Sequence, residues 1–301
     1  MSAPDPVLVT GASGFIGSRL CQALTEAGHQ VRAMTRRPAD YTGAGQPVGA
    51  DVQDPAGLAT ALAGVGTAYY LVHSLGSPDF ERLDAQAART FATEAARAGV
   101  RRIVYLGGLG ADDEALSPHL RSRRTVESLL GQAGVPVTTL RAAVVIGHGG
   151  ISWEITRQLV DHLPAMLVPS WVGTRSQPIA LADVVGYLVG VLDDPATGSV
   201  VYEIGGPEVL SYRQMLQRAA RIQNRRGLPI VTVPLLTPRL SSAWLALVTD
   251  VDLATARNLV DSMITEVVVR DQSVRRVVRL TPMGYDDAVR AALAERAATT
   301  G

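Results

Sequence analysis

The sequence contains no lysine and only one cysteine, and both absences limit its chemistry. All 28 of its Lys+Arg residues are arginine, so any mechanism that requires a lysine ammonium is excluded. The lone cysteine, Cys21, cannot form an internal disulfide, which suits a reducing compartment. The formal net charge is zero, so the composition gives no electrostatic reason to bind nucleic acid or an anionic membrane.

Long hydrophobic runs are absent as well. No apolar stretch reaches the ~18 residues that a membrane span needs. Residues 1–6 lack the basic and apolar regions of a signal peptide, and the histidines and the cysteine do not show metal-ligand spacing. These absences predict a cytoplasmic chain with no membrane, nucleic-acid or metal partner. Hydrophobic residues still make up 47% of the chain, which is enough for a substantial core.

The most informative stretch that is present covers residues 7–17, VLVTGASGFIG. An apolar run typical of a buried strand ends at a glycine-rich turn, and a helical pattern follows at once. Gly11 allows a sharp turn, Gly14 allows the backbone to approach a pyrophosphate, and Gly17 allows the helix to pack closely on the strand. The start of such a helix favours a phosphate, although a glycine turn without a ligand would look the same.

Strand-like and helical segments alternate over the first half of the chain. In chain order, and beginning with a strand, they are residues 30–35, 54–62, 67–72, 79–98, 102–106, 119–133 and 137–146. The alternation predicts an α/β fold with a doubly wound parallel sheet of the Rossmann type. Beyond residue 150 the pattern loosens into helices, one segment of them at 239–263, and strands, the last at 266–269. We therefore predict a sheet domain at 1–150 and a smaller α+β lobe at 151–301 that packs on it and returns segments to the sheet.

Two arginines mark the end of the second predicted strand. Arg36 follows Gly17 by about 20 residues, the position at which a dinucleotide-binding unit contacts the adenosine ribose. A carboxylate there would bind the ribose 2′-hydroxyl, whereas an arginine binds a 2′-phosphate. The pair Arg36-Arg37 therefore favours NADP(H) over NAD(H), the alternative being a solvated pair on a loop. Asp51, after a presumed short third strand near residues 48–50, is a candidate for contact with the adenine amino group or an ordinary turn aspartate.

The segment TGASGFIG at residues 10–17 resembles the TGxxGxxG fingerprint of extended and atypical short-chain dehydrogenases/reductases. Residues 70–74 and 101–110 also fall where that superfamily has its strand ends. More closely, the chain is similar to the NmrA-like branch, in a bacterial subgroup with a C-terminal extension, and the likeness covers residues 7 to 215. The resemblance implies that NADP(H) is held by Gly11, Ser13, Gly14, Phe15, Ile16, Gly17, Arg36, Asp51, Val52, Val72, His73, Ser74 and Gly107.

The catalytic set of that superfamily is missing. The resemblance implies a serine after the fifth strand and Tyr-x-x-x-Lys on the next helix. Here the strand runs into Gly107, and the helix carries His119 and Arg123, which keep the i, i+4 spacing and share one helix face. His119 can exchange a proton near neutral pH, Arg123 can bind oxygen atoms, and His73 follows a strand on the ligand-binding edge of the sheet. These three are the catalytic candidates, and a surface position for His119 is the alternative.

Two functions agree with these features. The first, which we favour, is an NADPH-dependent oxidoreductase that reduces a small apolar carbonyl, enone or quinone-like substrate beneath the C-terminal lobe. The second is a non-catalytic NADP(H)-binding redox sensor or regulatory protein, which the NmrA-like resemblance allows. A nucleotide-sugar epimerase or dehydratase ranks third, because the tyrosine and lysine are missing. The expected partner is a small-molecule substrate. A homodimer or protein partner stays open, because helices facing a second subunit show the same pattern as core helices.

Overall fold

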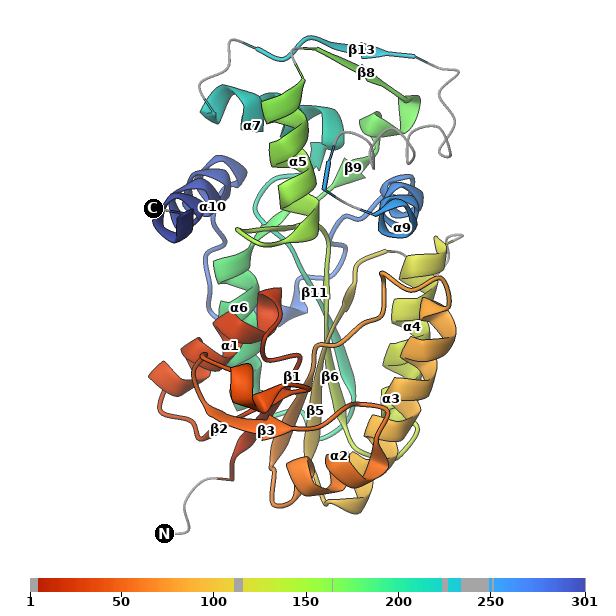
Figure 1. Cartoon of the computed structure of the whole chain (residues 1–301), viewed down its shortest axis with the longest axis vertical. Coiled ribbons are helices and arrows are strands. Elements are labelled where there is room, and N and C mark those ends of the chain that lie inside the picture. The colour runs from red at the N-terminus through yellow and green to blue at the C-terminus, as the bar shows by residue number, and fades with distance from the viewer. Residues whose placement is uncertain are drawn as a thin grey trace.

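A seven-stranded parallel sheet forms the centre of the molecule, in the order β11-β6-β5-β4-β1-β2-β3 (Figure 1). The computed structural model describes residues 5–110, 116–163, 165–223, 227–233, 249–250 and 252–300. The strands of the sheet are β1 (Val7–Thr10), β2 (Val31–Thr35), β3 (Gln46–Gly49), β4 (Thr67–Tyr70), β5 (Arg102–Gly108), β6 (Val137–Ala142) and β11 (Val200–Ile204). The predicted doubly wound parallel sheet is confirmed, with the strand order reversing between β1 and β4.

Helices cover both faces of this sheet. The helices are α1 (Phe15–Glu26) and α6 (Leu181–Gly190) on one face, and α2 (Pro55–Leu62), α3 (Phe80–Arg97) and α4 (Pro118–Gly131) on the other. Successive side chains of a strand point to opposite faces. Accordingly, Val7 and Val9 pack with α1 and α6, whereas Leu8 packs with α2 and α3. Burial on both faces explains why the central strand β1 reads as an apolar run.

Local capping signals set where two of these helices begin. Asp54 accepts hydrogen bonds from the amides of Ala56 and Gly57, and Pro55 occupies the first helical position of α2. In the same way, the Ser117 hydroxyl accepts from the amide of Leu120 at the start of α4. The second cap matters for the site, because α4 carries two of the three catalytic candidates.

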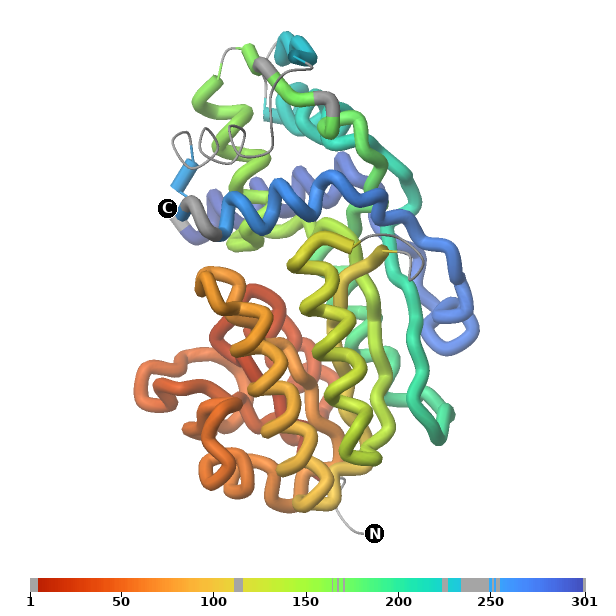
Figure 2. The backbone as a smooth tube through the Cα atoms, turned by 90° about the vertical axis from the view of Figure 1, so that its right-hand side faces the viewer, coloured from red at the N-terminus to blue at the C-terminus, as the bar shows by residue number. Residues whose placement is uncertain are grey.

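The C-terminal lobe lies over the carboxyl ends of the central strands (Figures 1 and 2). Its helices are α5 (Ile151–His162), α7 (Tyr212–Ile222), α9 (Leu253–Met263) and α10 (Tyr285–Thr300). Short strands pair as β7 (Val145–Ile146) with β10 (Ile179–Ala180), β8 (Met166–Val168) with β13 (Ile230–Thr232), and β9 (Arg175–Ser176) with β12 (Leu210–Ser211). The 3-10 turns are Pro38–Asp40, Ser170–Gly173, Val191–Asp193 and Ser273–Arg276. Because α6 and β11 return to the sheet, the lobe is not a contiguous segment, and a domain boundary at residue 150 stays a prediction.

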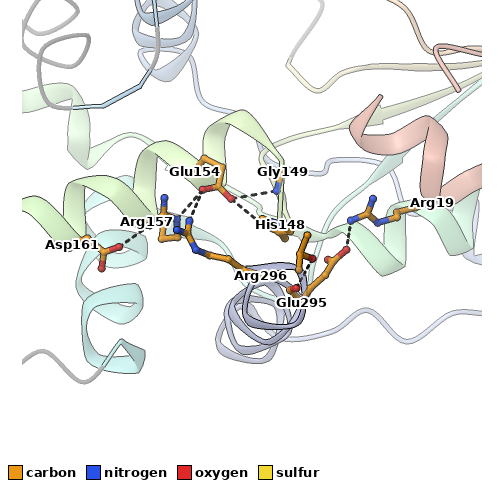
Figure 3. Close-up of polar contacts among 9 residues, drawn as sticks. Arg19, His148, Gly149, Glu154, Arg157, Asp161, Glu295 and Arg296 are labelled. Carbon is orange, nitrogen blue, oxygen red and sulfur yellow. Dashed lines mark hydrogen bonds and ion pairs between the residues drawn. The ribbon is translucent and has the colours of Figure 1, made fainter. Parts of the chain in front are cut away.

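Helix α10 connects the lobe to the sheet domain through arginine–carboxylate contacts (Figure 3). Glu295 of α10 pairs with Arg19 of α1, and Arg296 lies 3.5 Å from Glu154 of α5. Glu154 also accepts from Arg157 at 2.8 Å. A single helix thus contacts both halves of the chain, although partly exposed ion pairs of this kind contribute about 1 kcal/mol or less to stability.

The strand predicted at 266–269 is wrong. This segment forms one isolated bridge, between Ser176 and Val267. The amide of Val269 donates instead to the side chain of Gln177 at 3.0 Å, and the amide of Asp271 donates to Glu203 at 3.0 Å. Side-chain acceptors therefore take amides that a strand ladder would use. Of the helical segment predicted at 239–263, residues 253–263 are seen as α9, while 234–248 lie outside the described residues.

Candidate cofactor and substrate site

The turn between β1 and α1 has the tight geometry that its glycines predict. Gly11 has φ +64°, in the left-handed region that favours glycine. A Cβ atom on Gly17 would lie 2.2 Å from the carbonyl oxygen of Gly11, so only glycine lets α1 begin this close to the turn. Gly14 is the N-cap of α1, and among the described residues no side chain caps this end. The first amides of α1 are thus available to a phosphate group.

A cleft of about 280 Å³ opens beside this turn, at the carboxyl ends of the central strands. In doubly wound sheets, dinucleotides bind at this edge, where the strand order reverses. The predicted site residues that line the cleft are Gly11, Gly14, Phe15, Ile16, Gly17, Val72, His73, Gly107, His119 and Arg123. The cleft therefore brings the three catalytic candidates together with the glycine turn, although they come from separate segments of the chain.

The other predicted cofactor residues lie outside the cleft lining. They are Ser13, Arg36, Asp51, Val52 and Ser74. Arg36 is exposed just after β2, and the amide of Ala12 donates to the carbonyl of Met34 at 3.2 Å, which ties the glycine turn to the end of that strand. Asp51 accepts from the amide of Gln53 at 2.9 Å. Asp51 therefore makes the local turn contact of an Asx motif, and a contact with adenine remains a prediction.

His73 is held as a neutral imidazole. The residue is solvent-exposed and lines the cleft. Desolvation by the surrounding protein, and then the positive charge of Arg123, lower the pKa of His73 to about 4. The amide of Leu75 donates to Nδ1 at 3.4 Å, so the ring proton of the neutral form belongs on Nε2. His73 is thereby a hydrogen-bond donor at neutral pH.

His119 lies in the first turn of α4 and is partly buried, so its side chain is not freely exposed. Burial, followed by the charges of Arg123 and His73, lowers the pKa of His119 to about 3. Protonated His119 is therefore scarce at neutral pH. The ring can donate a hydrogen bond to a substrate oxygen, but it is a poor reservoir of protons.

Two buried tyrosines, Tyr70 in the cleft wall and Tyr105 behind it, do not take the place of the missing catalytic tyrosine. Tyr70 and Tyr105 are almost fully buried, and their rings contact each other with centroids 6.2 Å apart. Burial raises the pKa of Tyr105 despite the opposing charge of Arg123, and the Tyr105 hydroxyl donates to the Arg123 carbonyl at 3.3 Å. Both phenols thus stay protonated, and the layer supports α4 under Arg123.

A second cavity of about 240 Å³ continues from the cleft into the lobe. The two share Phe15, Ile16, Leu106, Gly108, His119, Ala142, Ala143 and Val145. The lobe adds a wall that sequence reasoning missed: Gly150, Ile151, Ser152, Tyr212, Leu259, Ser262, Met263 and Val267. No local motif marks these residues, because their common feature is a tertiary contact between α5, α7, α9 and the sheet.

Hydrogen bonds from α9 fix the lobe against the cleft. Asn258 donates its side-chain amide to the carbonyl of Leu75 at 3.2 Å, next to the segment that carries His73. The hydroxyls of Ser262 and Ser117 lie 3.2 Å apart, which joins α9 to the cap of α4. A larger cavity of about 340 Å³ lies elsewhere, between α1, α6 and α10, and contains none of the predicted site residues.

Within 5–110, 116–163 and the later described segments, no group of histidine, cysteine, aspartate and glutamate could hold a metal ion. In the same part of the chain, no helix has the length and apolar character required to cross a membrane.

Comparisons with known proteins agree with this geometry. Residues 11–195 match the model of a family described as NAD(P)H-binding. A Streptomyces griseus protein, (4-alkanoyl-5-oxo-2,5-dihydrofuran-3-yl)methyl phosphate reductase, is 27% identical over 230 residues, which span 73% of this chain and 74% of the relative. The Escherichia coli NADPH-dependent quinone oxidoreductase QOR2, solved with NADPH, superposes with a TM-score of 0.76 at 21% identity and covers 94% of this chain and 98% of its own.

A third protein with this fold was solved with a different set of ligands. MoeE5, solved with UDP-glucuronic acid and NAD, has a TM-score of 0.75 and 22% identity, with 98% of this chain and 99% of that chain covered. The family match covers more than half of the chain and includes the glycine turn and the cleft. The chain therefore belongs to this NAD(P)H-binding family.

Proposed function

We propose that this protein is an NADPH-dependent reductase of small, apolar, uncharged carbonyl, enone or quinone-like compounds. The observation that carries the proposal is the composition of the second cavity. Among the described residues, its lining contains no aspartate, glutamate or arginine, and its ionisable groups are His119 and Tyr212. Because His119 is neutral and burial raises the pKa of Tyr212, the cavity is uncharged at neutral pH.

The cleft lining includes Arg123, whereas the described lining of the second cavity is uncharged. This difference supports separate roles for the two, the cleft in binding the cofactor and the cavity in binding the substrate. NADPH, when bound, supplies a hydride to an electrophilic carbon. The glycine turn would hold the pyrophosphate, and Arg36 the 2′-phosphate. Arg123 lines the cleft but not the second cavity, which favours a contact with the cofactor ribose over one with the substrate. His119 lines both, which suits a hydrogen bond to the substrate oxygen beside the nicotinamide.

The proton balance follows from the lowered pKa of His119. Reduction of a carbonyl adds a hydride to carbon and a proton to oxygen. At neutral pH the neutral imidazole of His119 donates its N–H group to the substrate oxygen. The proton that this oxygen gains comes from water and is relayed by the imidazole. Ser152 adds a further hydroxyl to the cavity wall, whereas the Ser262 hydroxyl already donates to the Asn258 carbonyl at 2.8 Å.

A nucleotide-sugar substrate, as bound by MoeE5, fits this cavity poorly. A nucleoside diphosphate carries negative charge, and cationic side chains are the usual partners of phosphate groups. The described lining of the second cavity offers none. The missing tyrosine and lysine also disfavour the epimerase and dehydratase reactions.

Turnover of NADPH with a substrate panel tests the proposal. The panel pairs uncharged quinones, enones and aldehydes with carboxylated analogues of equal size. NADPH oxidation is measured as the loss of its near-ultraviolet absorbance. We expect oxidation with the uncharged members of the panel and little with the carboxylated ones. If NADPH binds and no member is reduced, the reductase proposal fails and the redox-sensor function takes its place.

A further inference from the structure

Helix α3 carries two buried acids that differ in their partners. Asp84 and Glu94 are each 5% exposed. Glu94 forms an ion pair with Arg97 at 2.6 Å, one turn further along α3 and away from the cleft. Asp84 has neutral partners: the backbone amide of Ser74 at 2.7 Å and the hydroxyl of Ser122 at 3.5 Å. Burying a carboxylate costs free energy unless its contacts compensate, so the contacts of Asp84 indicate its role.

These contacts connect Asp84 to both segments that carry the catalytic candidates. Ser74 directly follows His73 on the segment after β4. Ser122 directly precedes Arg123 on α4, one turn beyond His119. One carboxylate on α3 thus contacts two separate walls of the cleft.

The contact with Ser74 also bears on the orientation of the His73 ring. Asp84 takes the amide of Ser74, and the next amide, that of Leu75, donates to Nδ1 of His73. The direction of the first hydrogen bond fixes the peptide plane that precedes the second. A change at Asp84 would therefore alter the backbone that selects the Nε2–H form of His73.

We propose that Asp84 is a positioning residue for the NADPH cleft, which holds the His73 segment and α4 in register with each other. Asp84 acts through these residues and does not line the cleft itself. The proposal depends on the proposed function only in that the cleft binds NADPH. Its effect on His73 can be measured in the protein without cofactor.

The test compares Asp84→Ala, Asp84→Asn and the matched control Glu94→Ala. Alanine removes both contacts of Asp84, whereas asparagine can still accept from the Ser74 amide and donate to the Ser122 hydroxyl. Glu94→Ala removes an equally buried acid from the same helix and lowers stability without touching the cleft. Thermal unfolding establishes that each variant is folded at the working temperature.

Two measurements then separate positioning from stability. Nitrogen–proton correlation NMR of the cofactor-free protein reports the tautomer of His73, and calorimetry reports the dissociation constant for NADPH. We expect Asp84→Ala to lose the pure Nε2–H form and to raise the dissociation constant about 10-fold or more. Asp84→Asn should stay within about threefold of the wild type and Glu94→Ala within about twofold.

The outcomes distinguish this proposal from the function on which it depends. Equal effects of Asp84→Ala and Glu94→Ala on His73 and on NADPH would overturn the positioning role. If the wild type binds no NADPH, the proposed function fails. The NMR comparison of His73 in the same variants still decides whether Asp84 positions the ring.

Discussion

The cleft and the second cavity form one continuous binding site, and its two ends are built in different ways. The phosphate end comes from one continuous stretch, residues 10–17, whose backbone shape depends on Gly11 and Gly17. The substrate end is assembled from distant segments, in which Phe15, His119 and Met263 meet in one cavity. The first end is set by local sequence, whereas the second depends on how the lobe packs on the sheet. Mutations should therefore affect cofactor binding and substrate turnover separately.

The largest expected effect is at the phosphate end. Gly17→Ala places a Cβ atom 2.2 Å from the Gly11 carbonyl oxygen, so the turn must open. We expect a loss of stability of about 1–3 kcal/mol, typical of overpacking, and NADPH affinity weakened about 100-fold or more. Calorimetric titration and chemical unfolding measure the two effects. Gly198→Ala, which meets no atom within 4 Å, is the control and should change neither.

A smaller and selective effect is expected at Arg36. Arg36→Ala should weaken NADPH binding about 10- to 100-fold, because a charge-assisted contact to the 2′-phosphate is lost. NADH binding should stay within about twofold, since NADH carries no such phosphate. Fluorescence titration of the two cofactors provides the comparison within one variant. Equal losses for NADPH and NADH would show that Arg36 does not contact the 2′-phosphate.

At the substrate end, we expect turnover to fall while cofactor binding is unchanged. Met263→Arg adds a cation to the uncharged cavity, and kcat/KM for an apolar substrate should fall about 10-fold. The dissociation constant for NADPH should not change, because Met263 lines only the second cavity. Ile264→Arg is a matched control, since Ile264 is 47% exposed and lies outside both linings. A parallel loss of cofactor binding in Met263→Arg would contradict the division of the binding site into two ends.

The mildest effect concerns pH. With folded-state pKa values of about 4 for His73 and about 3 for His119, neither ring titrates near neutrality. We expect kcat/KM to be flat between about pH 6 and 8. An inflection between these pH values that disappears in His119→Asn would show that His119 exchanges protons as a charged acid.

The same shifts give stability a pH dependence of defined sign. Because folding lowers both pKa values from 6.5, the unfolded chain binds more protons below that pH. Stability should therefore be complete above about pH 6.5 and fall as the pH approaches the folded values. Thermal unfolding of His119→Asn should show a shallower decline than the wild type. An equal or steeper decline would contradict the lowered pKa of His119.

The unequal predictability of the two ends has a physical cause. The glycine turn, Arg36 and the parallel sheet follow from short-range patterns, in which backbone geometry and spacing determine the structure. The lobe wall has no such pattern, because Ser262 and Tyr212 enter the cavity through helix packing. The wrong strand at 266–269 has the same origin, since the Gln177 side chain takes an amide that periodicity assigned to a ladder.

Asp84 shows how a residue can matter and still escape sequence reasoning. On α3 it stands among alanines and charged residues that look like an ordinary amphipathic helix. Only the fold shows that its carboxylate receives the Ser74 amide and lies beside Ser122. Conversely, Asp51 stood out in the sequence, and the structure shows a contact with the Gln53 amide of its own turn.

Transfer of deuterium from NADPH labelled at the nicotinamide C4 tests the central claim most directly. The labelled cofactor is incubated with the purified protein and an uncharged quinone, enone or aldehyde, and the products are examined by mass spectrometry. If the cleft and the apolar cavity work as one reductase site, the deuterium appears in the reduced enone or aldehyde, or NADPH is consumed in step with quinone reduction. NADPH that binds in the cleft, stays unoxidised and passes no label to any of these compounds would contradict it.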